Sequence, residues 1–85
     1  PNPFNPEVQL ELIAGGPGTA HLFVYNVLGQ RVGSVPLMPA VQAGQRLVVR
    51  WDGRDRDGHT VATGVYVFVV DTPEGRLTRK GLLMR

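Results

Sequence analysis

Residues 51–70 read WDGRDRDGHTVATGVYVFVV, and this stretch decides the fold of the chain. Its first part, residues 52–58, is a turn rich in aspartate and glycine that directly follows Trp51. Its last part, GVYVFVV at residues 64–70, is dense in β-branched and aromatic side chains, which favour extended strands. Because this part is apolar on both faces, we expect it to be a central strand that is buried on two sides.

The residues that follow predict a hairpin. TPEG at residues 72–75 places proline second and glycine fourth, which is the chemistry of a type I turn. Residues 76–85, RLTRKGLLMR, then return as the partner strand. Leu77 lies at an odd position and Leu82 at an even one, so we expect a β-bulge near Gly81 that brings both to the same face.

The segments that precede Trp51 alternate between apolar and polar side chains, as half-buried strands do. The alternation is strict at residues 8–12 (VQLEL) and continues at 20–26 (AHLFVYN) and 45–51 (QRLVVRW). Residues 31–37 (RVGSVPL) predict a weaker strand whose proline suits the edge of a sheet. Short strands separated by turn signals indicate an all-β chain folded as a β-sandwich.

The length of 85 residues is that of one domain with a small core. We divide the chain into a proline-rich linker at residues 1–6 (PNPFNP) and a β-domain at residues 7–85. Pro1 is an unusual natural start, so we expect the chain to be part of a longer protein. The absence of cysteine excludes disulfides and thiolate metal sites.

The formal net charge of +2 is too small to indicate nucleic-acid binding, and it is unevenly distributed. Residues 1–30 contain two acidic residues and no lysine or arginine, whereas residues 31–85 contain nine basic and five acidic residues. The sequence has no apolar run of about eighteen residues or more, so we expect no membrane insertion.

Residues that would support catalysis are scarce, because catalysis requires a nucleophile, an acid–base pair or a metal at a defined separation. His21 lies in a predicted strand and His59 in a turn, without ligand or triad spacing, and we expect both at the surface. Ser34 is the single serine and lacks the flanking glycines of a nucleophile elbow. We therefore expect neither an enzyme nor a cofactor.

The acidic turn resembles the middle of a calcium loop, in which carboxylates at alternate positions precede a glycine. Asp55, Asp57 and Gly58 follow that pattern. However, Gly53 stands where a further acid is needed, Gly64 stands where a bidentate glutamate closes the loop, and arginines are interleaved with the acids. We therefore interpret the segment as a polar turn in which aspartate side chains cap backbone N–H groups, with Asp55 and Asp57 as a weak calcium alternative.

Four aromatic residues are candidates for stacking on a sugar ring, namely Phe23, Tyr25, Tyr66 and Phe68. Tyr66 and Phe68 belong to the predicted central strand, so we assign them to the core. Phe23 and Tyr25 share the other face of their strand and are left for solvent or a neighbouring domain. An accessory carbohydrate-binding module is therefore one alternative function.

The last ten residues combine basic and apolar side chains. The basic residues are Arg76, Arg79, Lys80 and Arg85, and the apolar ones between them are Leu82, Leu83 and Met84. Charges on an edge strand commonly prevent edge-to-edge aggregation. A basic strand with interleaved apolar residues also suits recognition by a partner. Both interpretations stay open, as does a homodimer through an unpaired edge strand.

Four motifs in sequence resemble the C-terminal sorting domain of the type IX secretion pathway: PNPFNP, VYNVLGQRV, WDGRDRDGHTVATGVYVFVV and TRKGLLMR. They are also similar to the immunoglobulin-like domain of the flagellar hook scaffolding (hook-capping) protein, the FlgD-like class. The resemblance extends over nearly the whole chain. It implies an all-β, immunoglobulin-like antiparallel β-sandwich of about seven short strands.

The resemblance also assigns recognition residues. Pro1, Asn2 and Pro3 match the opening Pro-Asn-Pro motif. Gly64 and Tyr66 match a Gly-x-Tyr motif. Lys80, with Leu82 and Leu83 after it, matches a terminal motif of lysine followed by apolar residues, and we include its basic neighbour Arg79 among the recognition residues. The chain departs from the pattern at Gly81, where the family has an apolar residue.

What the resemblance implies is export. Family members lie at the end of large secreted or surface proteins and are recognised by the outer-membrane secretion machinery. We therefore expect a non-catalytic sorting domain for a parent cargo domain upstream, with the product secreted or held at the cell surface. The hook-scaffold relatives imply instead a structural spacer or assembly module.

Overall fold

Six β-strands and their connecting turns make up the part of the chain that is described by the structure, a computed structural model covering residues 7–13, 20–36, 43–72 and 75–84. The strands are β1 (Val8–Ile13), β2 (His21–Tyr25), β3 (Arg31–Pro36), β4 (Arg46–Trp51), β5 (Gly64–Thr72) and β6 (Gly75–Leu83). Within these ranges there is no helix with the length and apolar character that crossing a membrane requires. The predicted linker at residues 1–6 lies outside the described residues.

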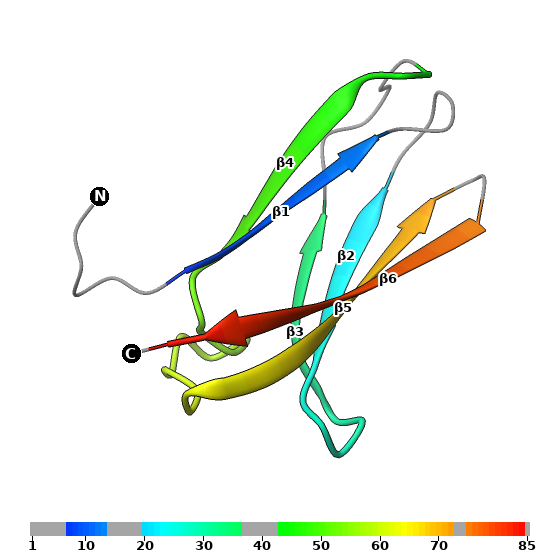
Figure 1. Ribbon diagram of the computed structural model, residues 1–85. Coiled ribbons are helices and arrows are strands. Elements are labelled where there is room, and N and C mark those ends of the chain that lie inside the picture. Colours follow the sequence, from blue (N-terminus) through cyan, green and yellow to red (C-terminus); the bar gives the residue numbers. More distant parts are fainter. Residues whose placement is uncertain (1–6, 14–19, 37–42, 73–74, 85) are drawn as a thin grey trace.

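The strands form two antiparallel sheets that face one another (Figure 1). One sheet pairs β1 with β4, and the other has the order β3-β2-β5-β6. The predicted edge position of the strand that begins at Arg31 is confirmed for residues 31–36, because β3 ends the four-stranded sheet, and residue 37 lies outside the described part of the chain. The predicted immunoglobulin-like β-sandwich is also confirmed, with six strands in the described residues.

The core lies between the sheets and follows the alternation of the sequence. On β2, Leu22 and Val24 are fully buried, whereas the three residues that alternate with them are only partly buried. On β4, Trp51 is buried and its ring meets Tyr66 and Phe68 edge-on, at centroid distances of 5.0 and 5.6 Å. Edge-to-face contacts of this kind stabilise a core beyond the area that they bury.

The prediction for residues 64–70 is correct in pairing and wrong in burial. β5 is central, between β2 and β6. Tyr66, Phe68 and Val70 are buried, but Val67 and Val69 on the other face are only half-buried. No described element covers that outer face, since the second sheet packs on the inner one.

Two turns show how local chemistry sets the strand register. In the β2–β3 turn, the side-chain Oδ1 of Asn26 accepts hydrogen bonds from the N–H groups of Leu28 and Gln30, both at 3.0 Å, and Gly29 has φ 80°. The β5–β6 hairpin closes with Thr72 opposite Gly75, as the sequence predicts. The two residues between them, on which the predicted turn type rests, are outside the described part of the chain.

Candidate functional site

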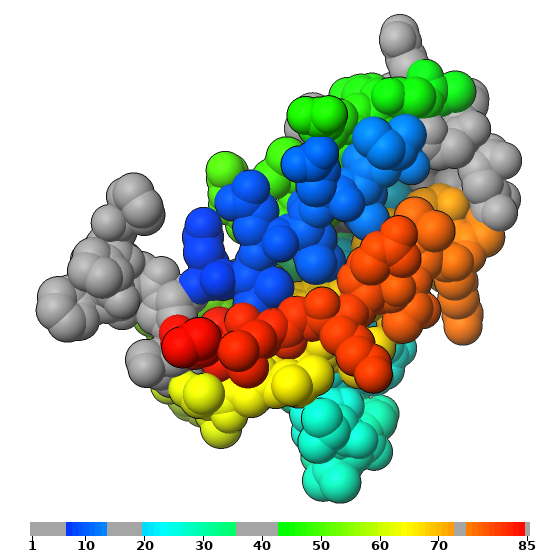
Figure 2. All heavy atoms as spheres, viewed as in Figure 1, coloured from blue at the N-terminus to red at the C-terminus, as the bar shows by residue number. Residues whose placement is uncertain are grey.

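The last described strand, β6, is an edge strand of the four-stranded sheet, and its two sides differ in what they face. It pairs with β5 in an unbroken antiparallel register from Thr72↔Gly75 to Gly64↔Leu83. Because successive side chains of a strand point to opposite faces, Leu77, Gly81 and Leu83 face the core, and the even-numbered residues face outward. Figure 2 shows β6 beside β1 at the surface of the molecule.

The predicted bulge near Gly81 is wrong, because the register does not shift there. The inward residue is Leu83, which is fully buried, so Leu82 does not need to turn toward the core. Gly81 has a different role. A Cβ at this position would lie 2.7 Å from Phe68 Cε2 and 2.7 Å from Val8 Cγ1, so the missing side chain leaves room for Val8 of β1 and Phe68 of β5 to pack against β6.

The residues of the predicted terminal motif divide between the two sides of β6. Lys80 and Leu82 lie on the outer side, and Leu82 is 56% exposed. Leu83 belongs to the core. Arg79 is on the inner side by register, opposite Phe68, yet its side chain is exposed and donates to the Thr78 carbonyl at 2.9 Å. An inward-facing charge on an edge strand discourages pairing with another strand.

Gly64 and Tyr66, predicted as recognition residues from the Gly-x-Tyr motif, lie at the start of β5. Tyr66 is buried, and its hydroxyl donates to the Ala62 carbonyl at 2.7 Å. A tyrosine hydroxyl that bonds back to the backbone a few residues upstream is a recurrent device of immunoglobulin-like sandwiches. Gly64 pairs with Leu83, so the two motifs meet at one end of the β5–β6 hairpin. The opening motif, residues 1–3, lies outside the described residues.

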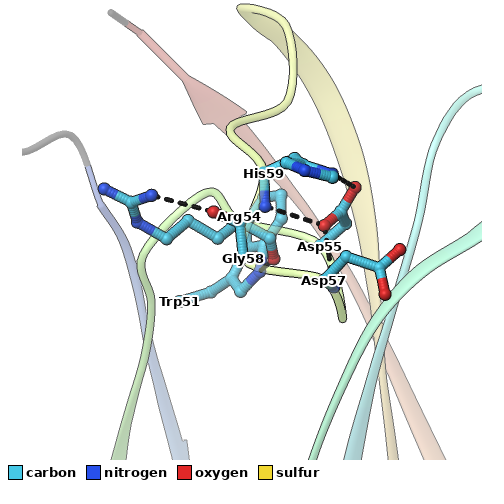
Figure 3. A network of polar contacts seen from close by, with 6 residues as sticks. All are labelled: Trp51, Arg54, Asp55, Asp57, Gly58 and His59. Carbon is cyan, nitrogen blue, oxygen red and sulfur yellow. Dashed lines mark hydrogen bonds and ion pairs between the residues drawn. The ribbon is translucent and has the colours of Figure 1, made fainter.

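The acidic turn between β4 and β5 is held by its own side chains (Figure 3). The Oδ1 atom of Asp55 accepts hydrogen bonds from the N–H groups of Asp57 and His59, both at 3.0 Å. The same bonding recurs at Asp52, whose Oδ1 accepts from the N–H of Arg54 at 3.1 Å. The interpretation as a turn capped by aspartate side chains is confirmed.

The structure adds His59 to the weak calcium candidates. Asp55, Asp57 and His59 each offer one ligand atom, and these atoms lie within 4.8 Å of one another. Sequence spacing did not identify this histidine, because only the folded turn brings its ring to 3.9 Å from the Asp55 carboxylate. Asp57 and His59 are exposed, and Asp55 Oδ1 is engaged by two backbone donors, so the cluster serves first to shape the turn.

Two of the four aromatic candidates, Tyr66 and Phe68, are buried in the core, as predicted. Phe23 is half-buried on the outer face, where the His21 ring stacks on it at a centroid distance of 4.6 Å. The guanidinium of Arg31 lies 5.5 Å from the same ring. Phe23 is therefore partnered by protein groups, and His21, predicted to be a surface residue, is itself only partly exposed and bonds to Ser34.

Comparison with known families decides the classification, because the family model of the FlgD Ig-like domain matches residues 7–75. The chain belongs to the FlgD Ig-like domain family. This is a structural, non-enzymatic family. The match begins just before β1 and ends where β6 begins, so most of the terminal strand lies beyond it. A search of curated proteins finds no match.

Solved structures share the fold. FlgD from P. aeruginosa is 24% identical over 91% of the chain, with a TM-score of 0.72, and FlgD from Xanthomonas campestris, described for hook capping in flagellar assembly, is 22% identical over 93% with a TM-score of 0.70. The chain spans 59% and 56% of these two proteins. Dimeric latent PorU from Porphyromonas gingivalis is 22% identical over 96% of the chain, with a TM-score of 0.66, and the chain spans 8% of it.

Proposed function

We propose that the chain is a non-catalytic sorting domain, which directs a larger cargo protein through the outer-membrane type IX machinery to the cell surface or outside. The observation that carries the proposal is the position of Lys80 and Leu82, which project from the outer side of an exposed edge strand. The resemblance of the four motifs to type IX sorting domains and the shared fold with PorU support it.

In this proposal, the inner side of β6 holds the strand on the core and the outer side binds the receptor. Gly81 and Leu83 fix the strand on the core, so that the outer side chains have one defined position. Lys80 and Leu82 then supply charge and apolar surface to a receptor of the secretion machinery. Charge complementarity of this kind mainly sets orientation and association rate.

The test fuses residues 1–85 to a neutral reporter and follows the reporter across the outer membrane of a type IX-competent host. We expect K80A/L82A to abolish export, because it removes the outward residues and leaves the core unchanged. The matched control is V48A/R50A, which removes an exposed apolar and an exposed basic residue from β4. Export by K80A/L82A at the level of the unmodified fusion would overturn the proposal.

A second candidate is a structural module that helps to assemble its parent protein, as a hook-scaffold type of domain would. The family match and the two FlgD structures favour it. In this case the reporter fusion would stay inside the cell, whereas removal of residues 7–84 from the parent protein would prevent its assembly. Size-exclusion chromatography of the parent protein with and without this domain measures that outcome.

A further inference from the structure

The two outer faces of the sandwich differ in how their charges are compensated. On the β1–β4 sheet, Arg46 pairs with Glu11 at 3.0 Å and Arg50 lies 3.7 Å from Glu7. Each arginine of that face therefore has a carboxylate partner, either in β1 or directly before it. Exposed pairs of this kind are typical of a solvated surface and contribute little to stability.

The outer face of the four-stranded sheet has an apolar centre instead. We call this centre the outer stripe, and it consists of Phe23, Tyr25, Val65, Val67, Val69 and Leu82. The members are neighbours across three strands, since Phe23 is opposite Val69, Tyr25 is opposite Val67, and Val65 is opposite Leu82. Val65 and Leu82 are 44% and 56% exposed, and the other four are half-buried.

Two cations border the outer stripe without a carboxylate partner in the described part of the chain, although the guanidinium of Arg31 also lies 5.5 Å from the Phe23 ring. Arg31 is opposite Tyr25 on β3, and Lys80 is opposite Val67 on β6. Neither forms an ion pair within the described residues. A carboxylate is present at the far end of this face, on Asp71, but it already pairs with Arg76 at 3.5 Å.

We propose that the outer stripe, with Arg31 and Lys80, is a docking surface for a protein segment that is apolar at its centre and acidic at its border. An apolar patch with a polar rim is the common anatomy of a protein interface. The two cations without a carboxylate partner determine the charge that we expect of the binding partner. A carboxylate opposite each of them would form ion pairs like those that the arginines of the β1–β4 face make within the chain.

A second copy of the chain is a poor occupant of this surface. A two-fold symmetric dimer presents the same patch from both copies. Such a dimer would bring Arg31 and Lys80 of each copy into one interface, and the carboxylate described on this face, that of Asp71, is already paired with Arg76. Like charges across an interface oppose association.

This inference deepens the proposed function. It rests on that function for Lys80 and Leu82, which belong both to the proposed sorting surface and to this docking surface. It adds Arg31 and the outward residues of β2 and β5, which are not among the recognition residues that the resemblance assigns. The test below uses the purified chain alone and needs no secretion machinery. If K80A/L82A lost export but the chain bound no acidic peptide, the sorting role would stand and this partner chemistry would be rejected.

The experiment titrates ¹⁵N-labelled chain with two synthetic peptides that share the apolar centre Val-Phe-Val-Leu and carry either glutamates or lysines on both sides. We expect the glutamate peptide to shift the amide signals of residues 21–25, 65–69 and 78–82, and the lysine peptide to leave them unchanged. R31Q/K80Q should weaken binding by roughly tenfold or more, because two interfacial charges are lost. R31E/K80E should reverse the preference between the peptides.

Controls separate the outer stripe from charge alone. R46Q/R50Q removes the same charge from the β1–β4 face and should leave the affinity unchanged. V65S/L82S alters two exposed apolar residues and should weaken binding while the fold persists. Equal affinity of V65S/L82S and the unmodified chain, absence of binding by the glutamate peptide, or concentration-dependent dimerisation through these same residues would each overturn the proposal.

Discussion

Gly81 is the residue at which the fold depends on the absence of a side chain. Phe68 and Val8, which come from the two different sheets, both lie where a Cβ of this residue would be. We expect Gly81→Ala to reduce the free energy of unfolding by about 1–3 kcal/mol, because the added methyl would overlap both side chains. Urea unfolding followed by circular dichroism measures the change.

Thr78→Ala is the matched control, since Thr78 is an exposed position of the same strand. A surface substitution of this kind should change the free energy of unfolding by less than about 0.5 kcal/mol. Equal stability of Gly81→Ala and Thr78→Ala would contradict the close approach of Phe68 and Val8 to Gly81.

Tyr66 tests a single hydrogen bond. Tyr66→Phe removes the hydroxyl that donates to Ala62 at 2.7 Å and keeps the ring against Trp51. We expect a loss of about 1 kcal/mol in the free energy of unfolding, the usual net value of one such bond. Tyr25→Phe is the control, because Tyr25 is half-buried on the outer face. Equal stability of the two variants would contradict the assignment of Tyr66 as an anchor of the turn before β5.

At the scale of elements, the acidic turn connects β4 to β5 and depends on Asp55. Asp55→Ala removes the acceptor of two backbone hydrogen bonds, so we expect a loss of about 1–2 kcal/mol in the free energy of unfolding. Asp55→Asn keeps an oxygen acceptor and should stay within about 0.5 kcal/mol of the unmodified chain. Thermal unfolding of the two variants measures both effects, and a result in the opposite order would contradict this role.

The same turn gives a prediction about calcium. Because Asp55 Oδ1 already accepts two backbone hydrogen bonds, we expect excess CaCl₂ to leave the melting temperature unchanged. A ligand that binds only the folded state raises the melting temperature with its concentration. An increase that EDTA reverses would therefore show that the carboxylates and His59 bind the ion.

The alternation of apolar and polar residues predicted most of this fold. It failed to predict which residues of β6 face the core, because that depends on the pairing of β6 with β5. Residues 8–12 and 45–51 alternate clearly, and their buried positions are as expected. In β6, the apolar residues occupy both parities, so the sequence alone cannot say which of Leu82 and Leu83 is buried. The register with β5 decides this, because Gly64 and Tyr66 place Leu83 and Gly81 on the inner face.

The candidate recognition surface was predictable only in part. The basic and apolar residues of β6 are visible in the sequence, but the outward position of Leu82 is not, because the predicted bulge would have brought it to the face of Leu77. The contribution of Arg31 was not predictable, since it lies far along the chain and reaches this face only through the pairing of β3 with β2. The outer stripe was hidden for the same reason that β5 was expected to be buried on both sides.

At the scale of the whole molecule, the sandwich is closed by pairings between distant segments. β1 pairs with β4, with Val8 opposite Trp51, so the first and middle parts of the chain must meet before the core is complete. Domains dominated by such non-local contacts fold slowly, and we expect refolding on the order of milliseconds to seconds. Trp51 is the single tryptophan and is buried, so its fluorescence in stopped-flow refolding reports this step. Refolding within microseconds would contradict the expectation.

The edge position of β6 has a consequence for quality control. The outer side chains Lys80 and Leu82 are held in place by Gly81 and Leu83, their immediate neighbours on the inner side. If Val8 or Phe68 is displaced, Gly81 no longer packs between them. The positions of the outward side chains of β6 then change as well. We therefore expect the proposed partner to bind only those copies in which both sheets are correctly packed, although it does not contact the core itself.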